Sequence, residues 1–175
     1  MNRPTNEGRM PDFGEKNARL REDTLANIRK LRNTLTKELI SIALFLLLSI
    51  VALDNFSVFP SLSEPIRAAL GRPPAANMIS AVLLLYVFSA IILILARMMS
   101  GSGRYGGVAH VGYLAGFYIF YHLSGKLPEN FWAVFASGAT VLGLESYHVW
   151  LYCSEEIEKE RETLAFLNNK PGGRE

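Results

Sequence analysis

The sequence has a single cysteine, Cys153, among its 175 residues. One thiol excludes a disulfide within the chain and any metal site built from several cysteines. The chain also has little net charge, +2 at pH 7 with histidine neutral, and its basic residues are not interleaved with aromatic ones. Both features argue against nucleic acid as a partner.

Charged side chains are missing from long stretches of the chain, although they make up 19% of all residues. The stretch Ala76–Leu95 has none and is apolar all round. A core helix of a soluble domain would instead carry a polar stripe. About twenty apolar residues, with a rise of ~1.5 Å each, cross the ~30 Å hydrocarbon core of a bilayer. The sequence therefore predicts a membrane protein.

Four apolar stretches have about the length of a membrane span, and together they take up roughly half of the chain. We expect each to form a transmembrane helix, at residues 39–59, 76–98, 107–123 and 131–153. Because the connections between them are short, consecutive helices should be antiparallel neighbours. The expected fold class is an all-α integral membrane protein with four transmembrane helices in an up-down-up-down bundle.

Both ends of the chain are charged and lie outside the predicted spans. In the N-terminal segment 1–38, apolar residues recur at helical spacing from 15 to 37, which predicts an amphipathic helix after a disordered start. The C-terminal segment 154–175 repeats this pattern, either as a new helix beginning at Ser154 or as a continuation of the last span. The first extension is basic and the start of the second is acidic. The two could pack together, or each could be solvated by itself.

Lysine and arginine are distributed unevenly along the predicted bundle. Of the 18 such residues, nine precede Leu39, two flank the second connection and four lie in the tail, which leaves three for the other two connections. The positive-inside rule then places both termini in the cytoplasm. We expect a multi-pass protein of the cell inner (plasma) membrane.

Glu145 and His148 need an explanation because they lie inside the last predicted span. An ionisable group at the bilayer centre costs ~2.5 kcal/mol or more, so it usually marks a pathway, a cofactor or an internal partner. The two residues are three positions apart, one turn from each other on one helix face. We take them as a candidate catalytic pair that handles protons or a quinone. A di-metal site would need a second such pair and two more glutamates, so we predict no metal site within one chain.

The third predicted span carries an aromatic face. His110, Tyr113 and Phe117 fall on it at helical spacing, as a cofactor-binding face for a quinone ring or a b-type haem would require. His110 and His148 are the one pair of histidines at similar depth on different helices. The alternative is that this face packs against lipid or the protein core. Asp54 and His122, at the predicted outer ends of their spans, have a structural role in this interpretation.

Small residues on the same two helices indicate a conflicting arrangement. The Gly-x-x-x-Gly motif that begins at Gly112 lies roughly opposite His110, and Gly143 lies roughly opposite Glu145. If the helices pack through these small faces, His110 and Glu145 point away from one another and cannot share one iron. We expect this packing, which directs Glu145 and His148 toward the first or second helix or toward a partner chain.

No motif in the sequence names a reaction, and the lack of redox motifs and extramembrane domains argues against a self-sufficient enzyme. Two function classes stay open. In the first, the chain is a small polytopic subunit of a larger membrane complex, with other membrane subunits as partners, in quinone-linked electron transfer of the menaquinol or ubiquinol oxidoreductase type. In the second, it is a non-catalytic membrane scaffold or assembly factor whose polar residues satisfy one another.

Overall fold

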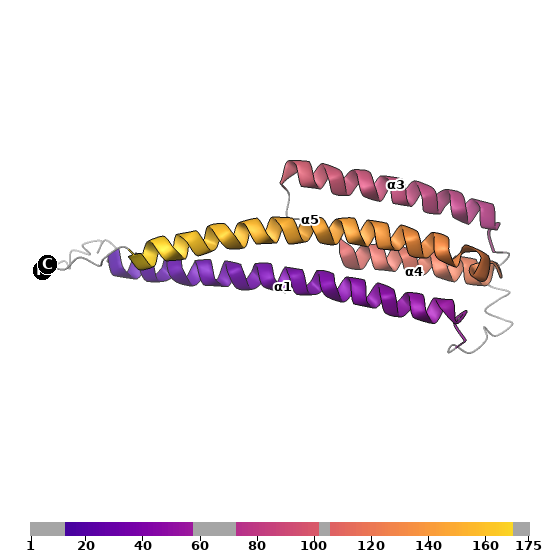
Figure 1. Ribbon diagram of the computed structural model, residues 1–175, viewed down its shortest axis with the longest axis horizontal. Helices are drawn as coiled ribbons and strands as arrows, with labels where there is room; N and C mark the ends of the chain where they lie inside the picture. The colour runs from indigo at the N-terminus through magenta and orange to yellow at the C-terminus, as the bar shows by residue number, and fades with distance from the viewer. Residues whose placement is uncertain (1–12, 58–72, 102–105, 170–175) are drawn as a thin grey trace, which may run out of the picture. The chain divides into compact units, whose positions relative to one another are not determined.

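The computed structural model describes residues 13–57, 73–101 and 106–169 of the chain (Figure 1). Within these ranges the regular structure consists of four α-helices, and no strand is found. The helices are α1 (Phe13–Leu53), α3 (Ala76–Ser100), α4 (Gly107–Leu123) and α5 (Leu127–Asn169). The prediction of an all-α chain is confirmed.

Helix α1 joins the predicted N-terminal extension and the first predicted span into one helix. Neither proline nor glycine lies between Glu15 and Leu53, so nothing in the backbone interrupts it. The helix ends at Leu53 rather than at the predicted Phe59, because Asn55 and Phe56 adopt φ values of 51° and 55°. Asparagine enters this left-handed conformation more readily than most residues. The last two positions of the predicted span lie outside the described residues.

Helices α3 and α4 agree closely with the predicted spans. Both bounds of α4 coincide with the prediction, and α3 begins at the predicted Ala76 and continues two residues further, to Ser100. Gly101 ends α3 with a φ of 63°, a conformation that costs glycine little. Its N–H faces the carbonyls of Arg97 and Met98.

Helix α5 runs without a break through Cys153, the predicted end of the last span. The C-terminal extension therefore continues this helix, and no new helix starts at Ser154. The helix also begins four residues earlier than predicted, with Pro128 in its first turn. Proline is tolerated there because the N–H groups of a first turn have no partner within the helix.

Two of the four helices are long and apolar enough to cross a membrane, Lys16–Leu53 within α1 and Ala76–Ser100. Only 28% of the apolar part of the first helix and 22% of that of the second is buried inside the structure. The core helix of a soluble protein would be mostly buried. Helix α4 has 17 residues. Its length of about 26 Å is somewhat shorter than a hydrocarbon core. The arrangement with four spans stays a prediction.

The chain divides into two compact units, unit 1 (Met1–Asn33 with Cys153–Glu175) and unit 2 (Thr34–Tyr152). Unit 1 brings together the start of α1 and the end of α5. There the Asn27 side-chain amide donates a hydrogen bond of 3.0 Å to Glu160 Oε1. The two helical extensions thus contact each other, as their charges suggested.

In unit 2, α1 and α4 run in the same direction. Glu38 of α1 is bonded to Gly107 at the start of α4. Ser49, eleven residues after Glu38, shares a hydrogen bond of 3.1 Å with Tyr118, which is eleven residues after Gly107. Each residue of a helix adds about 1.5 Å, so equal steps along both helices indicate parallel axes.

Helices α3 and α5 run opposite to α4. Near the start of α3, Ser80 shares a hydrogen bond of 2.8 Å with Tyr121 near the end of α4. Near the start of α5, Phe131 stacks on Tyr118, with ring centroids 5.7 Å apart. The chain therefore alternates in direction from helix to helix, and residues late in α3 and α5 meet the start of α4.

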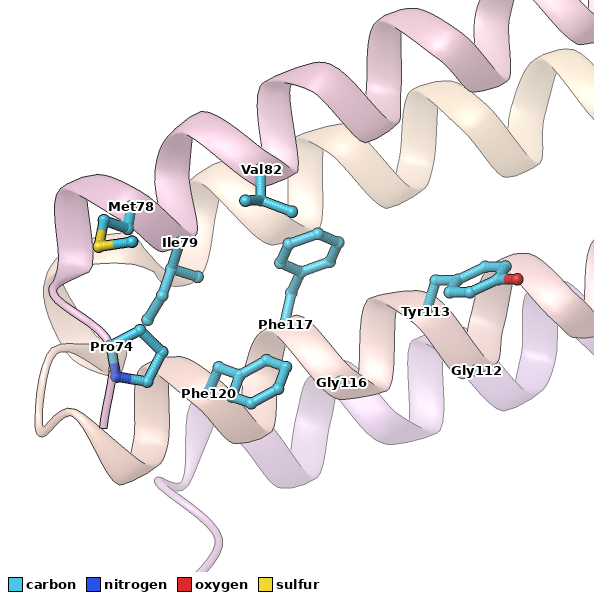
Figure 2. A pocket seen from close by; sticks show the side chains of 9 residues that line it. All are labelled: Pro74, Met78, Ile79, Val82, Gly112, Tyr113, Gly116, Phe117 and Phe120. Carbon is cyan, nitrogen blue, oxygen red and sulfur yellow. The ribbon is translucent and has the colours of Figure 1, made fainter. Parts of the chain in front are cut away.

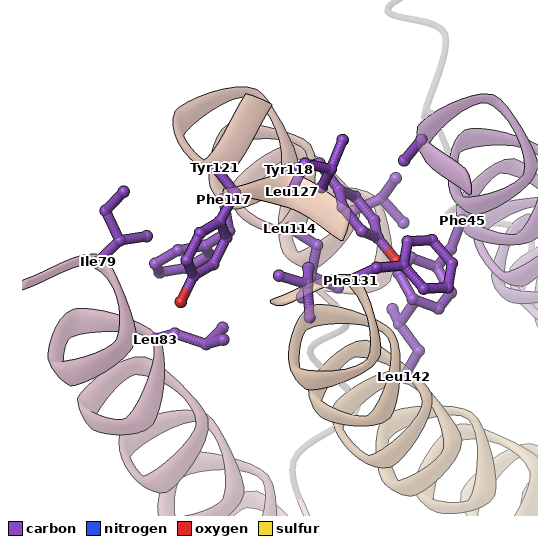
Figure 3. Packing of buried hydrophobic residues seen from close by; sticks show 13 residues of the cluster. Phe45, Ile79, Leu83, Leu114, Phe117, Tyr118, Tyr121, Leu127, Phe131 and Leu142 are labelled. Carbon is purple, nitrogen blue, oxygen red and sulfur yellow. The ribbon is translucent and has the colours of Figure 1, made fainter. Parts of the chain in front are cut away.

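The core of unit 2 is largely aromatic where α1, α4 and α5 meet (Figure 3). Phe45 of α1 stacks on Phe135 of α5, with centroids 5.9 Å apart. Gly138 makes room for this contact, because a methyl group at that position would overlap the Phe45 ring and approach Leu114. This close approach sets which faces of α4 and α5 point inward.

The expected packing through the other small residues is wrong within this chain. A methyl group added at Gly112, Gly116 or Gly143 would meet no described atom within 4 Å. Helices α4 and α5 meet instead through Gly138 and the large residue Leu114. Spacing alone does not show which of several small residues on a helix faces a neighbour, because bulky core residues set the helix rotation.

Candidate functional site

Glu145 is a fully buried carboxylate at the junction of α3, α4 and α5. Its Oε1 accepts a hydrogen bond of 2.8 Å from the backbone N–H of Gly106, and it lies 3.6 Å from Nη1 of Arg97. The start of α4 carries partial positive charge, which favours an anion. The backbone amide, the guanidinium and the helix therefore all stabilise a negative charge on Glu145.

A second carboxylate, Glu38 of α1, meets the same helix start. It is buried and accepts a hydrogen bond from the backbone N–H of Gly107, where a methyl group would overlap the carboxylate. Consecutive amides of the chain thus hold carboxylates from α1 and α5. The sequence interpretation placed Glu38 in the N-terminal segment and gave it no role. Its position directly before the apolar stretch was the available signal.

Two effects raise the pKa of the Glu38 carboxyl above its ordinary value of 4.5. Removal from water is the larger, and the negative charge of Glu145 adds to it, while the hydrogen bond from Gly107 opposes both. Glu38 precedes the apolar stretch of α1, at the rim of the predicted membrane region. It therefore keeps its proton to higher pH than an exposed glutamate does.

His148 is buried one turn after Glu145. Neither Nε2 of His148 nor Oε2 of Glu145 has a hydrogen-bond partner among the residues that the structure describes. These two atoms are therefore not bonded to each other, although the spacing places both residues on one helix face. Buried polar atoms are usually paired with protein or with ordered water. Both atoms retain the capacity to bind a proton or a water molecule.

His110 is held by α3 and also lies near Glu145. Its Nδ1 shares a hydrogen bond of 2.8 Å with the hydroxyl of Tyr86. A methyl group at Gly106 would lie 3.7 Å from His110 Nε2 and 3.8 Å from Glu145 Oε1. Both side chains therefore lie next to Gly106. The expectation that His110 and Glu145 point away from one another is therefore wrong. That expectation assumed that α4 and α5 pack through Gly112, Gly116 and Gly143, and they do not.

Tyr86 contacts the whole aromatic face predicted on α4. Its ring centroid lies 6.0 Å from that of His110, 5.7 Å from Tyr113 and 5.6 Å from Phe117. The three predicted residues thus belong to one cluster, which is completed by a tyrosine that the sequence interpretation did not select. The available signal was that Tyr86 is the sole tyrosine in the uncharged stretch Ala76–Leu95.

An apolar groove of about 340 Å³ lies between α3 and α4. Tyr113, Phe117 and Phe120 form its aromatic side, and Figure 2 shows Phe117 turned toward Val82 of α3. Gly116, which also lines it, leaves the space in front of α4 open. Tyr113 is 62% exposed and Phe117 is buried, so the predicted face extends from the protein interior to the open side of the groove.

The geometry fits a small flat ring better than a haem. Tyr86 lies against the His110 ring, and neither His110 nor His148 lines the groove. A bis-histidine haem would need both histidines to face one cavity. Among the described residues, no group of three or more His, Cys, Asp or Glu side chains is arranged to hold a metal ion.

The ionisable residues at the opposite end of unit 2 have local partners. His122 Nδ1 lies 3.1 Å from Asn55 Oδ1, and its ring packs edge-on against Phe56, with centroids 5.2 Å apart. Ser57 donates a hydrogen bond to the carboxylate of Asp54. These contacts fit the structural role expected for both residues.

In comparisons with known proteins, no family model, no curated protein and no solved structure matches this chain.

Proposed function

We propose that this chain is a small polytopic subunit of a larger inner-membrane complex, and that the groove between α3 and α4 binds a quinone ring. One observation carries the proposal, namely that a series of side-chain contacts links the groove to Glu145. Tyr113 and Phe117 line the groove and pack on Tyr86, whose hydroxyl is bonded to His110. His110 in turn borders Gly106 together with Glu145.

The surface of α3 supports a membrane location. Leu84, Leu85 and Phe88 are 72%, 67% and 65% exposed, and they lie next to one another on the helix. Soluble monomers rarely expose large contiguous apolar patches, whereas a bilayer accommodates them. With both termini in the cytoplasm, as the charge distribution predicts, the end of unit 2 that holds Glu145 lies near the cytoplasmic surface.

The chemistry of a quinone matches both parts of the site. Its flat, apolar ring suits a groove with aromatic sides, and the Tyr113 hydroxyl offers a hydrogen bond to a quinone oxygen. Quinone reduction consumes protons and quinol oxidation releases them, so a titratable group near the ring is needed. Glu145 and His148 supply such groups, and Tyr86 and His110 link them to the groove. The electrons come from another subunit of the complex in this proposal.

A pair of glycine substitutions tests the groove. Gly116→Leu places a side chain in open space inside the groove, and Gly143→Leu places the same side chain in open space on α5, outside it. We expect Gly116→Leu to weaken binding of a short-tailed quinone by about tenfold or more, which corresponds to ~1.4 kcal/mol. Quenching of intrinsic fluorescence by the quinone, with the purified full-length chain in detergent, measures the affinity.

The matched variant decides whether any effect belongs to the groove. Gly143→Leu should bind the quinone with the affinity of the unmodified chain. Equal affinity in all three proteins, or the same loss in both variants, would contradict a quinone site between α3 and α4.

A scaffold or assembly factor is the second candidate, and one observation favours it. Polar pairs tie helices together at two depths, since Ser49 of α1 and Ser80 of α3 bond the hydroxyls of Tyr118 and Tyr121 on α4. Such pairs fix helix packing without any chemistry. If quinone binding is absent, and Tyr118→Phe reduces the amount of assembled parent complex, the scaffold is the better account.

A further inference from the structure

A second cavity, of about 320 Å³, lies between α1 and α4 beside the start of α4. Thr34, Lys37 and Glu38 of α1 line it together with the backbone around Gly106 and Gly107. A water molecule occupies about 30 Å³ in the liquid, so this cavity has room for several. Glu38 is the acid among its lining residues. The proposed quinone groove does not include any of these residues.

Glu38 lines this cavity and also contacts the carboxylate cluster. It is bonded to the amide of Gly107, and Glu145 is bonded to the neighbouring amide of Gly106. Removal from water raises the pKa of Glu38, and the nearby negative charge of Glu145 adds to this effect. Oε2 of Glu145 has no partner among the described residues, and His110 borders Gly106 as Glu145 does.

We propose that Glu38 is the proton port of this protein, through which a proton passes between water in the cavity and Glu145. The carboxylic acid of Glu38 gives its proton to the carboxylate of Glu145, and hydronium in the cavity then protonates the Glu38 carboxylate again. The reverse sequence releases a proton into the cavity, and no electron moves in either direction. The inference rests on the proposed function, because His110 and Tyr86 carry the route onward to the quinone groove.

The two acids differ in the groups that face them. Arg97 from α3 and the amide of Gly106 stabilise the charged form of Glu145, whereas Glu38 has the amide of Gly107. Lys37 of α1 lines the same cavity as Glu38. His110 of α4 borders Gly106 together with Glu145. Glu38 is therefore the acid that borders the cavity, and Glu145 is the acid that faces the Arg97 guanidinium.

Time-resolved infrared spectroscopy of the full-length chain in liposomes tests the port. The carboxyl band of Glu145 is assigned by its loss in Glu145→Gln, and its response to a rapid pH change is then followed. We expect Glu38→Gln to slow this response by about tenfold or more, while its final amplitude stays. Glu129→Gln removes an exposed acid in the first turn of α5, sixteen residues before Glu145, and should leave the rate unchanged.

A second variant keeps the test decisive if Glu38→Gln does not fold. Ala109→Phe narrows the cavity from α4, where Ala109 is exposed, and removes no charge. It should also slow the response of the Glu145 band. A Glu145 band that ignores pH, or one that responds at the normal rate in both variants, would overturn the port. Quinone binding by the same proteins, measured as above, shows separately whether the proposed function holds.

Discussion

Glu145 has two carboxylate oxygens with very different surroundings. Oε1 has the Gly106 amide and the Arg97 guanidinium, whereas Oε2 has no partner among the described residues. A buried ion pair is costly to break by removing one partner, because the other charge is then left without compensation. The function of Glu145 is therefore best tested by a substitution that keeps the shape of the side chain.

Glu145→Gln is such a substitution. The glutamine carbonyl still accepts the hydrogen bond from Gly106, while the ability to bind and release a proton is lost. We expect the parent complex to assemble and its quinone turnover to fall by about tenfold or more, as for the loss of a proton-transfer group. Turnover measured from acid to alkaline pH checks this, with Glu129→Gln as the exposed control.

If Glu145→Gln left turnover unchanged over the whole pH range, Glu145 would be a packing residue. The carboxylate cluster would then only hold α4 against α1 and α5, and the scaffold function would be the better account.

At the scale of single elements, α5 contains a tightly packed glycine and an open one. A methyl group at Gly138 would overlap the Phe45 ring, and one at Gly143 would meet nothing within 4 Å among the described atoms. The two positions are five residues apart on the same helix, so their intrinsic helix propensity is alike. Their difference in stability isolates the contact with α1.

We expect Gly138→Ala to lower the free energy of unfolding by ~1–3 kcal/mol, the usual cost of overpacking. Gly143→Ala should be neutral or stabilising by up to ~1 kcal/mol, because alanine restricts the unfolded chain. Thermal unfolding of both variants in the same detergent measures the difference. Equal stability would mean that Phe45 does not pack on Gly138.

At the scale of the whole molecule, the charge distribution predicts which ends of the helices face the cytoplasm. Ser57 after α1 and Ser100 at the end of α3 are both exposed, and they belong to opposite ends of unit 2. The single cysteine, Cys153, is buried and can be replaced by serine as a background for labelling.

In that background, a membrane-impermeant thiol reagent added to intact cells should label Ser57→Cys and not Ser100→Cys, because the second position faces the cytoplasm. Labelling after cell disruption shows that both thiols can react. The opposite pattern in intact cells would reverse the topology, and labelling of both positions or of neither would contradict their placement on opposite sides of a membrane.

The sequence by itself determined the helices. Apolar composition, together with glycine and proline, acts over a few neighbouring residues, so the bounds of α4 and the start of α3 could be predicted. It also singled out Glu145, His148 and the aromatic face of α4, because polar and aromatic residues stand out in an apolar stretch.

Only the tertiary structure decided which residues meet. Arg97, Glu38 and Tyr86 became partners of the predicted residues because α1 and α4 are parallel while α3 and α5 oppose them, which brings their side chains to one depth. Gly138, and not the glycine motif that begins at Gly112, became the point of close approach. A repeat of about 100° per residue offers several faces for contact. The simultaneous packing of bulky side chains on four helices selects one of them.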